Sequence, residues 1–151
     1  MNKEDKELLL KDLCGRFPYG VKLFSKYVDG LNTKEVVGRI SQIDDSMDLG
    51  IINETNDEYS FTYVAIHEAK PYLFPLSSMT EEQKIECFKG TPLEIDKYGD
   101  VAVKDDFYGN SQYTDLEIYL EVIDWLNKNH FDYRGLIPKD LAIDATGLNV
   151  Y

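Results

Sequence analysis

The sequence predicts an α+β fold in which about three helices cover a curled antiparallel sheet that is either open or closed into a small, partly open barrel. Apolar residues repeat at helical spacing near both ends of the chain, and the segment from 21 to 66 has the alternation and turn residues of successive strands. A short helix and a second hairpin are expected after that segment. The length of 151 residues favours one domain, residues 1–151.

The first helix is expected to begin near Asn2, a favourable N-cap, and to stop at Gly15. Its apolar side chains share one face, and its charged side chains lie mostly opposite, so the apolar face should pack on the sheet. The apolar set is Leu9, Leu10, Leu13 and Cys14, and the charged set is Lys6, Glu7, Lys11 and Asp12.

The strands expected next are residues 21–24, 36–40, 49–53 and 59–66. Asp29-Gly30 and residues 54–57 supply turns between them. Aromatic residues at every second position from 59 to 63 show the period-two pattern of a half-buried strand.

The second half of the chain is predicted to hold two helices and a short hairpin. Thr80 and Gln83 form a capping box that opens a helix ending at Gly90. The hairpin should pair residues 92–95 with 101–103.

The long helix should run from a capping box at Thr114 and Glu117 to about Lys128, and a short strand is expected at 141–143. Apolar residues at three- and four-residue spacing predict the face by which this helix is buried, with Trp125 extending it. These residues are Leu116, Tyr119, Leu120, Ile123 and Leu126.

The charge balance is strongly acidic, with 28 acidic against 16 basic side chains and a formal net charge of -12. Such a surface repels phosphates and anionic lipids, so neither direct nucleic-acid binding nor membrane binding is expected. Cys14 and Cys87 lack the number and spacing of a disulfide framework or metal site, and both are expected to be small buried hydrophobes. The absence of a signal-like apolar run near the N-terminus favours a cytoplasmic protein.

Residue spacing indicates no catalytic array, cofactor motif or metal-ligand set. His67 is expected in a solvated loop. His130 and Asp132 follow the long helix, and a metal site or a small hydrolase needs more groups than these two. Capping of the last helix carbonyls is therefore the favoured role of His130.

Residues 70–76 hold Tyr72 and Phe74 between two prolines. One interpretation is a rigid aromatic ledge for a partner or a flat ligand. The favoured interpretation is a strap that covers an open end of the sheet.

Arg134 follows Tyr133 and is the only arginine in the second half of the chain. It could bind a carboxylate or phosphate of a ligand, or it could tie the tail to an acidic neighbour such as Asp132 or Asp144.

Three blocks resemble a family of small uncharacterised proteins encoded by gut anaerobic bacteria and by their prophages and phages. The blocks are KDLCGRFPYGV at 11–21, KPYLFPLSSMTEE at 70–82, and DWLN at 124–127 followed by HFDYRGLI at 130–137. The family has no activity that we can name, so the resemblance assigns no catalytic residue. It implies a compact cytoplasmic accessory protein of mobile-element origin.

The leading functional hypothesis is a non-enzymatic protein that presents an acidic face to a host or phage protein, with a basic partner favoured. One form of it imitates the charge of DNA. The acidic face is assigned to Glu94, Asp96, Asp100, Asp105, Asp106, Asp115, Glu117, Glu121 and Asp124.

The second hypothesis is a small-ligand or nucleotide-binding protein that sequesters its ligand, with aromatic residues stacked on a base and Arg134 on a phosphate. A small hydrolase using His130 and Asp132 has less support, and the oligomeric state is left open. The candidate binding residues are Tyr72, Phe74, His130, Tyr133 and Arg134.

Overall fold

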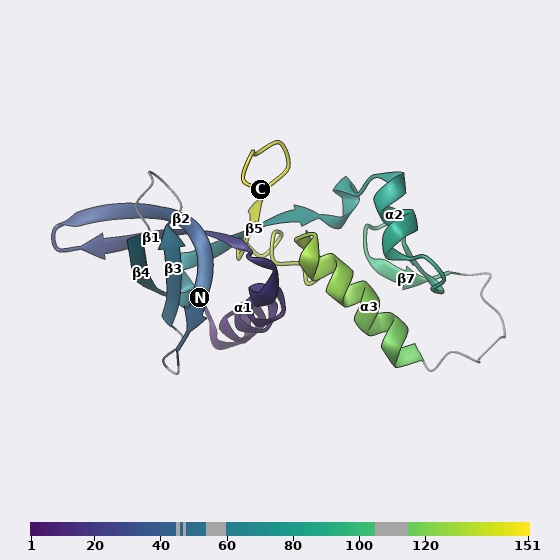
Figure 1. Ribbon diagram of the computed structural model, residues 1–151, viewed down its shortest axis with the longest axis horizontal. Coiled ribbons are helices and arrows are strands. Elements are labelled where there is room, and N and C mark those ends of the chain that lie inside the picture. The colour runs from purple at the N-terminus through teal and green to yellow at the C-terminus, as the bar shows by residue number, and fades with distance from the viewer. Residues whose placement is uncertain (45, 47, 54–59, 105–114) are drawn as a thin grey trace.

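Figure 1 shows a computed structural model of the chain, which describes residues 1–44, 46, 48–53, 60–104 and 115–151. The molecule is elongated. Helix α1 and the antiparallel strands lie at one end, α2, α3 and a small hairpin lie at the other, and strand β5 runs between them. The predicted α+β class is confirmed, and the larger sheet is curled but not closed into a barrel.

Within the described residues, the helices are α1 (Lys3–Arg16), α2 (Glu81–Cys87) and α3 (Asp115–Lys128), with short 3-10 turns at Phe17–Tyr19, Ile66–Glu68 and Leu76–Ser78. The strands are β1 (Lys22–Asp29), β2 (Asn32–Ile43), β3 (Asp48–Asn53), β4 (Ser60–Ala65), β5 (Ala69–Pro75), β6 (Leu93–Ile95), β7 (Val101–Val103), β8 (Phe131–Asp132) and β9 (Ile143–Asp144).

The larger sheet has the order β4-β3-β2-β1-β5-β8, and β9 also pairs with β5. Strands β1 to β4 form an antiparallel meander, and β1 also pairs antiparallel with β5. Both β8 and β9 run parallel to β5, so the tail returns to β5, and β8 forms the edge of the sheet. The predicted hairpins are confirmed, including the small β6–β7 hairpin.

Capping signals identified the first and second helices correctly. Asn2 accepts a hydrogen bond from the Asp5 amide at 2.7 Å and so caps α1. Thr80 and Gln83 form the expected reciprocal capping box on α2. The third predicted box depends on Thr114, which lies outside the described residues.

Strand β5 corrects the expectation that residues 70–76 form a strap across the end of the sheet. Leu73 is fully buried, whereas Tyr72 and Phe74 are half-buried. Pro71 stands opposite Leu23 of β1. The segment is therefore a strand within the sheet.

Two hydrophobic clusters stabilise the fold. The first lies between α1 and the sheet, where Leu9 and Leu13 pack with Leu23 and Ile51. The second joins α2, α3 and the small hairpin to β8. Both clusters draw on β5 or the residues that follow it, so this segment links the two ends of the molecule.

The two cysteines have different environments, which corrects the expectation that both are buried. Cys87 is buried in the second cluster, and burial, with a smaller contribution from Glu86, raises the pKa of its thiol to about 12. Cys14 is exposed because the buried side of α1 is centred on Leu9 and Leu13, and Cys14 points away from it.

Gly38 gives a test of the β2–β3 packing. A Cβ at this position would lie 2.1 Å from the Ile52 carbonyl oxygen on β3. We expect Gly38→Ala to lower the free energy of unfolding by about 2–3 kcal/mol, measured by urea denaturation. Gly30→Ala is the control, because Gly30 has a φ of 64° but open space around it, and its cost should be about 1 kcal/mol. Equal losses for the two variants would contradict this packing.

Candidate functional site

Two residues of α1 form a fully buried ion pair. Asp12 and Arg16 are each 0% exposed, and the guanidinium Nε and Nη2 donate to the two carboxylate oxygens at 2.7 and 3.0 Å. Asp12 was expected on the charged, outward side of the helix. It lies instead on the buried side, together with Leu9 and Leu13, because Arg16 follows one turn later and satisfies its charge.

Arg16 also connects α1 to the end of α3. Its Nη2 donates to the Phe131 carbonyl oxygen at 2.7 Å, and its Nη1 donates to the Leu126 carbonyl oxygen at 3.4 Å. The Leu126 bond satisfies a carbonyl group that the end of α3 leaves unpaired, and the cation complements the helix dipole, whereas the Phe131 carbonyl belongs to β8. The capping role that the sequence suggested for His130 is thus performed by Arg16.

Arg134 and Tyr133 extend this buried cluster. The Nε of Arg134 lies 3.5 Å from the Asp12 carboxylate, and both guanidinium groups lie over the Tyr133 ring, Arg134 at 4.8 Å and Arg16 at 5.5 Å. The Tyr133 hydroxyl donates to Asn127 Oδ1 at 3.0 Å. Arg134 therefore ties the tail to an acid, as one interpretation expected, but the acid is Asp12 on α1 rather than Asp132 or Asp144.

Asp132 organises the backbone of the tail. Its two carboxylate oxygens accept hydrogen bonds from the amides of Leu136 and Ile137 at 2.9 and 2.8 Å. Across the described residues, no group of three or more His, Cys, Asp or Glu side chains could hold a metal ion. Asp132 is the carboxylate that a hydrolase would need beside His130, and both of its oxygens are thus already hydrogen-bonded to backbone amides.

His130 is buried at the end of α3, where its backbone φ of 60° turns the chain into β8. Its ring stacks on Tyr151, with the ring centroids 4.1 Å apart and the planes 10° from parallel. Burial, with a smaller effect of the nearby Arg16 charge, lowers the pKa of the imidazole to about 4. The ring is therefore neutral at pH 7.

A hollow of about 590 Å³ opens beside His130, and we call it the His130 pocket. It lies between β5, the N-terminal end of α2, the C-terminal end of α3 and the tail. Residues that line it include Phe74, Gln83, Lys128, Asn129, Phe131 and Tyr151.

The five candidate binding residues lie in three different places. Phe74 and His130 line the His130 pocket, whereas Tyr133 and Arg134 belong to the buried cluster around Asp12. Tyr72 is half-buried next to β9, and its carbonyl oxygen accepts a hydrogen bond from the Tyr151 hydroxyl at 2.7 Å. The fold therefore does not bring these tyrosines and Arg134 together as one site in which a nucleotide could stack its base and bind its phosphate.

The predicted acidic face divides between the β6–β7 hairpin and α3. Its exposed members are Glu94 and Asp100 on the hairpin and Glu117, Glu121 and Asp124 on α3. Asp96 instead accepts the backbone N–H groups of Tyr98 and Asp100 and closes the hairpin turn. Outside the described residues lie Asp105, Asp106 and the side chain of Asp115.

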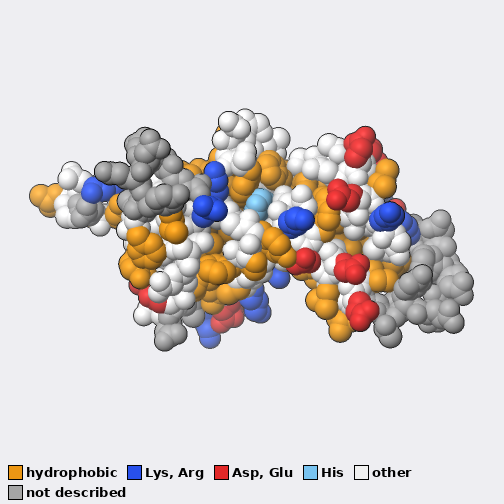
Figure 2. All heavy atoms as spheres, viewed as in Figure 1, with side chains coloured by type: hydrophobic (Ala, Val, Ile, Leu, Met, Phe, Trp, Pro, Cys, Tyr) orange, Lys and Arg blue, Asp and Glu red, His pale blue; other side chains and the backbone are white. Residues whose placement is uncertain are grey.

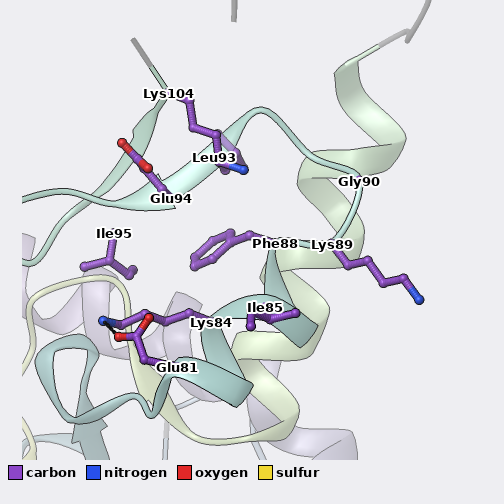
Figure 3. Close-up of a pocket in the computed structure, with 10 residues that line it drawn as sticks. All are labelled: Glu81, Lys84, Ile85, Phe88, Lys89, Gly90, Leu93, Glu94, Ile95 and Lys104. Atoms are coloured by element: carbon purple, nitrogen blue, oxygen red, sulfur yellow. Dashed lines mark hydrogen bonds and ion pairs between the residues drawn. The ribbon is translucent and has the colours of Figure 1, made fainter. Parts of the chain in front are cut away.

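A second hollow, of about 450 Å³, lies between α2 and the small hairpin (Figure 3). Phe88 points into it, and Lys84 pairs with Glu81 at 2.8 Å along one side. Lys104 and Glu94 stand on the other side. The charges near Glu94 are thus mixed, which is unlike the uniform negative charge of a DNA backbone.

The face of α3 predicted to be buried is mostly exposed, which corrects that prediction. The α3 stripe consists of Leu116, Tyr119, Leu120 and Ile123, which are 70%, 37%, 55% and 36% exposed. The helix packs through Val122 and Leu126 instead, both nearly fully buried. The apolar arc of α3 is wider than its contact with the rest of the chain, and the remaining part of the arc faces solvent.

Figure 2 shows acidic side chains gathered over the half of the molecule that holds α2, α3 and the small hairpin, with apolar and a few basic side chains between them. Glu117, Glu121 and Asp124 form a carboxylate flank beside the α3 stripe. Asp124 also accepts a short hydrogen bond from the Tyr19 hydroxyl, and this bond raises the pKa of that phenol.

Comparison with known proteins adds no assignment. No family model, curated protein or solved structure matches this chain. The resemblance to proteins of gut anaerobes and their phages stays a prediction. Over the described residues, no helix has both the length and the apolar character needed to cross a membrane.

Arg16 is the important residue that the sequence interpretation missed. Leu9, Asp12, Leu13 and Arg16 occupy positions i, i+3, i+4 and i+7 of one helix, which is the spacing of a single buried face. An acid and a base within such a face, one turn apart, could have indicated a buried ion pair.

Removal of the Arg16 charge tests the buried cluster. We expect Arg16→Met to lower the free energy of unfolding by about 3–5 kcal/mol, because it leaves the Asp12 carboxylate buried with its main partner removed. The double variant with Asp12→Leu should lose less than the sum of the two single variants, giving a coupling of about 2 kcal/mol or more in urea denaturation. Lys3→Met, which removes an exposed pair with Glu7, should change stability by less than about 0.5 kcal/mol.

His130 should titrate well below an ordinary histidine. We expect an NMR titration to place its pKa near 4 rather than 6.5, because protonation puts a charge in a buried site. As the pH falls, the unfolded chain therefore binds this proton at a higher pH than the folded chain does. The contribution of His130 to the free energy of unfolding is complete above about pH 6.5. It should be lost as the pH falls from 6.5 towards 4. His130→Asn assigns the resonance, and a midpoint near 6.5 would contradict the burial.

Proposed function

We propose that this protein is a non-enzymatic binding protein of the cytoplasm that uses α3 to hold a basic, amphipathic segment of a partner protein. The observation that supports the proposal best is the α3 stripe. Four large apolar side chains on one helix face are 36% to 70% exposed, and exposed apolar surface of this extent is typical of interaction sites.

The carboxylate flank supports the choice of a basic partner. Glu117 and Glu121 are one helical turn apart beside Leu120, and both are exposed. The protein also carries a formal net charge of -12, which attracts cations at long range. A partner segment with apolar side chains on one side and Lys or Arg beside them would match both features of α3.

We do not extend the proposal to imitation of DNA. Lys84, Lys89 and Lys104 line the same hollow as Glu94, so a continuous row of negative charge is not available there. The resemblance to small proteins of gut anaerobes and their phages adds the expectation that the partner is a host or phage protein.

Charge reversal on α3 tests the proposal with a defined probe, a synthetic helical peptide of leucine and lysine. We expect the peptide to bind the protein, and we expect Glu117→Lys with Glu121→Lys to weaken its binding by about tenfold or more in fluorescence anisotropy at low salt. Leu120→Ser should weaken binding at both low and high salt, because it removes apolar contact rather than charge.

Glu4→Lys with Glu7→Lys on α1 is the matched control, since it changes the net charge equally on another helix. An equal loss of affinity in this control, or unchanged binding in the α3 variants, would contradict the proposal and indicate attraction by net charge alone. Circular dichroism verifies that each variant keeps its helices.

A further inference from the structure

Strand β4 lies at one edge of the larger sheet. Among the described strands it pairs with β3 alone, and it ends the strand order. Figure 1 shows it at the end of the molecule opposite α3. An edge strand presents N–H and C=O groups with which a strand of another chain can pair.

The main chain of β3 shows which groups of β4 face outward. The Gly50 carbonyl oxygen accepts a hydrogen bond from Ser41 Oγ of β2 at 3.0 Å. The Ile52 carbonyl oxygen also faces β2, because a Cβ on Gly38 of that strand would collide with it. Main-chain groups alternate in direction along a strand, so Gly50 and Ile52 face β2 and the residues between them face β4.

This alternation continues in β4. Tyr63 and Phe61 stand opposite those two residues of β3, so their own main-chain groups point away from β3. Ala65 has the same direction, and its amide donates to Glu68 Oε2 at 3.3 Å. The outward edge therefore consists of the N–H and C=O groups of Phe61 and Tyr63, and Glu68 closes it at Ala65.

The side chains of the same two residues form an exposed aromatic pair. Phe61 is 48% and Tyr63 is 54% exposed, and their rings meet edge to face with centroids 4.8 Å apart. The Phe61 ring lies over Gly50, where the missing side chain leaves room for it. The pair is thus already ordered on the face of β4 opposite the buried Val64, which lowers the entropy cost of binding there.

The sequence of β4 lacks the usual protection of an edge strand. Charged residues or proline normally keep such edges from pairing with other chains. Residues 60–65 contain neither, although 29% of the whole chain is charged. The edge is therefore suited to pairing with another strand.

Two β4 strands are complementary to each other when they run antiparallel. With Thr62 on a two-fold axis, Phe61 of each copy stands opposite Tyr63 of the other, and the outward groups of both residues are paired. The aromatic side chains of the two copies then meet on one face of the joined sheet. A register shifted by two residues would use Ala65, whose amide already donates to Glu68.

The charge of the edge favours a second copy over the basic segment that suits α3. Basic side chains find their counterions on the carboxylate flank, whereas residues 60–65 offer none. A second copy presents the same uncharged aromatic surface. The net charge of -12 on each copy opposes association at long range, so the resulting dimer should be weak.

We propose that two copies of this protein form a two-fold dimer through their β4 edges, with Phe61 of each copy opposite Tyr63 of the other. The two larger sheets then become one continuous sheet. Because β4 and α3 lie at opposite ends of the molecule, both α3 stripes stay exposed in the dimer (Figure 1). This inference does not depend on the function proposed for α3, and either can fail without the other.

Sedimentation velocity on the purified chain tests the dimer. We expect a dimer with a Kd of roughly 0.1–1 mM, in keeping with a small interface. Added salt should strengthen it, because salt screens the repulsion between two acidic chains, whereas a complex of α3 with a basic segment should weaken. Tyr63→Lys should weaken the dimer by about tenfold or more, because it removes a ring and protects the edge with a charge. Tyr98→Lys is the matched control, since it makes the same charge change at a tyrosine that is 77% exposed on the small hairpin.

Disulfide cross-linking tests the register. A Cys14→Ser background removes the exposed native thiol, and the thiol of Cys87 is buried. In this background Thr62→Cys should form a cross-linked dimer on mild oxidation, because residues facing each other at the two-fold axis have Cα atoms about 4.5–5.5 Å apart. Tyr63→Cys should cross-link much more slowly, because the two copies of this position are diagonal neighbours about 7–8 Å apart. Circular dichroism verifies that each variant keeps its fold.

Three results would overturn the proposal. The first is a wild-type protein that stays monomeric at about 1 mM at both low and high salt. The second is a dimer that Leu120→Ser disrupts and Tyr63→Lys does not, which would assign the contact to the α3 stripe. The third is faster cross-linking of Tyr63→Cys than of Thr62→Cys, since the strands would then pair in another register.

Discussion

The buried pair of Asp12 and Arg16 is the interaction on which the rest of the structure depends. Removing two charges from water costs several kcal/mol for each ion, so the pair is tolerable only where every donor and acceptor has a partner. Arg16 meets this condition by reaching the carbonyl oxygens of Leu126 and Phe131 as well as Asp12. The charge requirement of one helix therefore dictates where the end of another helix must lie.

The position of α3 in turn decides the geometry of both candidate sites. Because its last turn is held by Arg16, the chain reverses at His130 and enters β8 alongside β5, where the Phe74 amide donates to the His130 carbonyl oxygen at 2.9 Å. The His130 pocket is formed at this reversal. Gly15 of α1 packs closely on Asn127 of α3 and permits the approach of the two helices.

The two ends of the molecule bury their apolar side chains to different extents. At the sheet end, a continuous meander and α1 bury the first cluster, and the buried pair of Asp12 and Arg16 lies on the same face of α1. At the other end, α3 buries only Val122 and Leu126 deeply and leaves the α3 stripe in solvent. The small hairpin and α2 are too short to cover the whole apolar arc of a fourteen-residue helix. Among the described residues, the exposed apolar surface thus results from how little structure packs on α3, and the proposed binding role depends on this surface.

The sequence by itself determined the elements whose signals are local. Asn2 and the Thr80 box mark helix starts through bonds to amides three residues away, and Gly30 and Gly99 mark hairpin turns that require a positive φ. Such signals depend on neighbours in the chain, so they predict helices, hairpins and the α+β class without knowledge of the fold. The acidic character of α3 was predictable in the same way.

Only the tertiary structure decided which faces were buried and which groups met. The periodicity of α3 identified an apolar arc, but not which part of it would find a partner, and the Leu120 side of it found none among the described residues. Asp12 looked like a surface acid until Arg134, far along the chain, and the end of α3 closed over it. The His130 pocket likewise required Tyr151 to return to β5. Burial and pairing between distant residues are set by the free energy of the whole packed chain, and no local pattern records them.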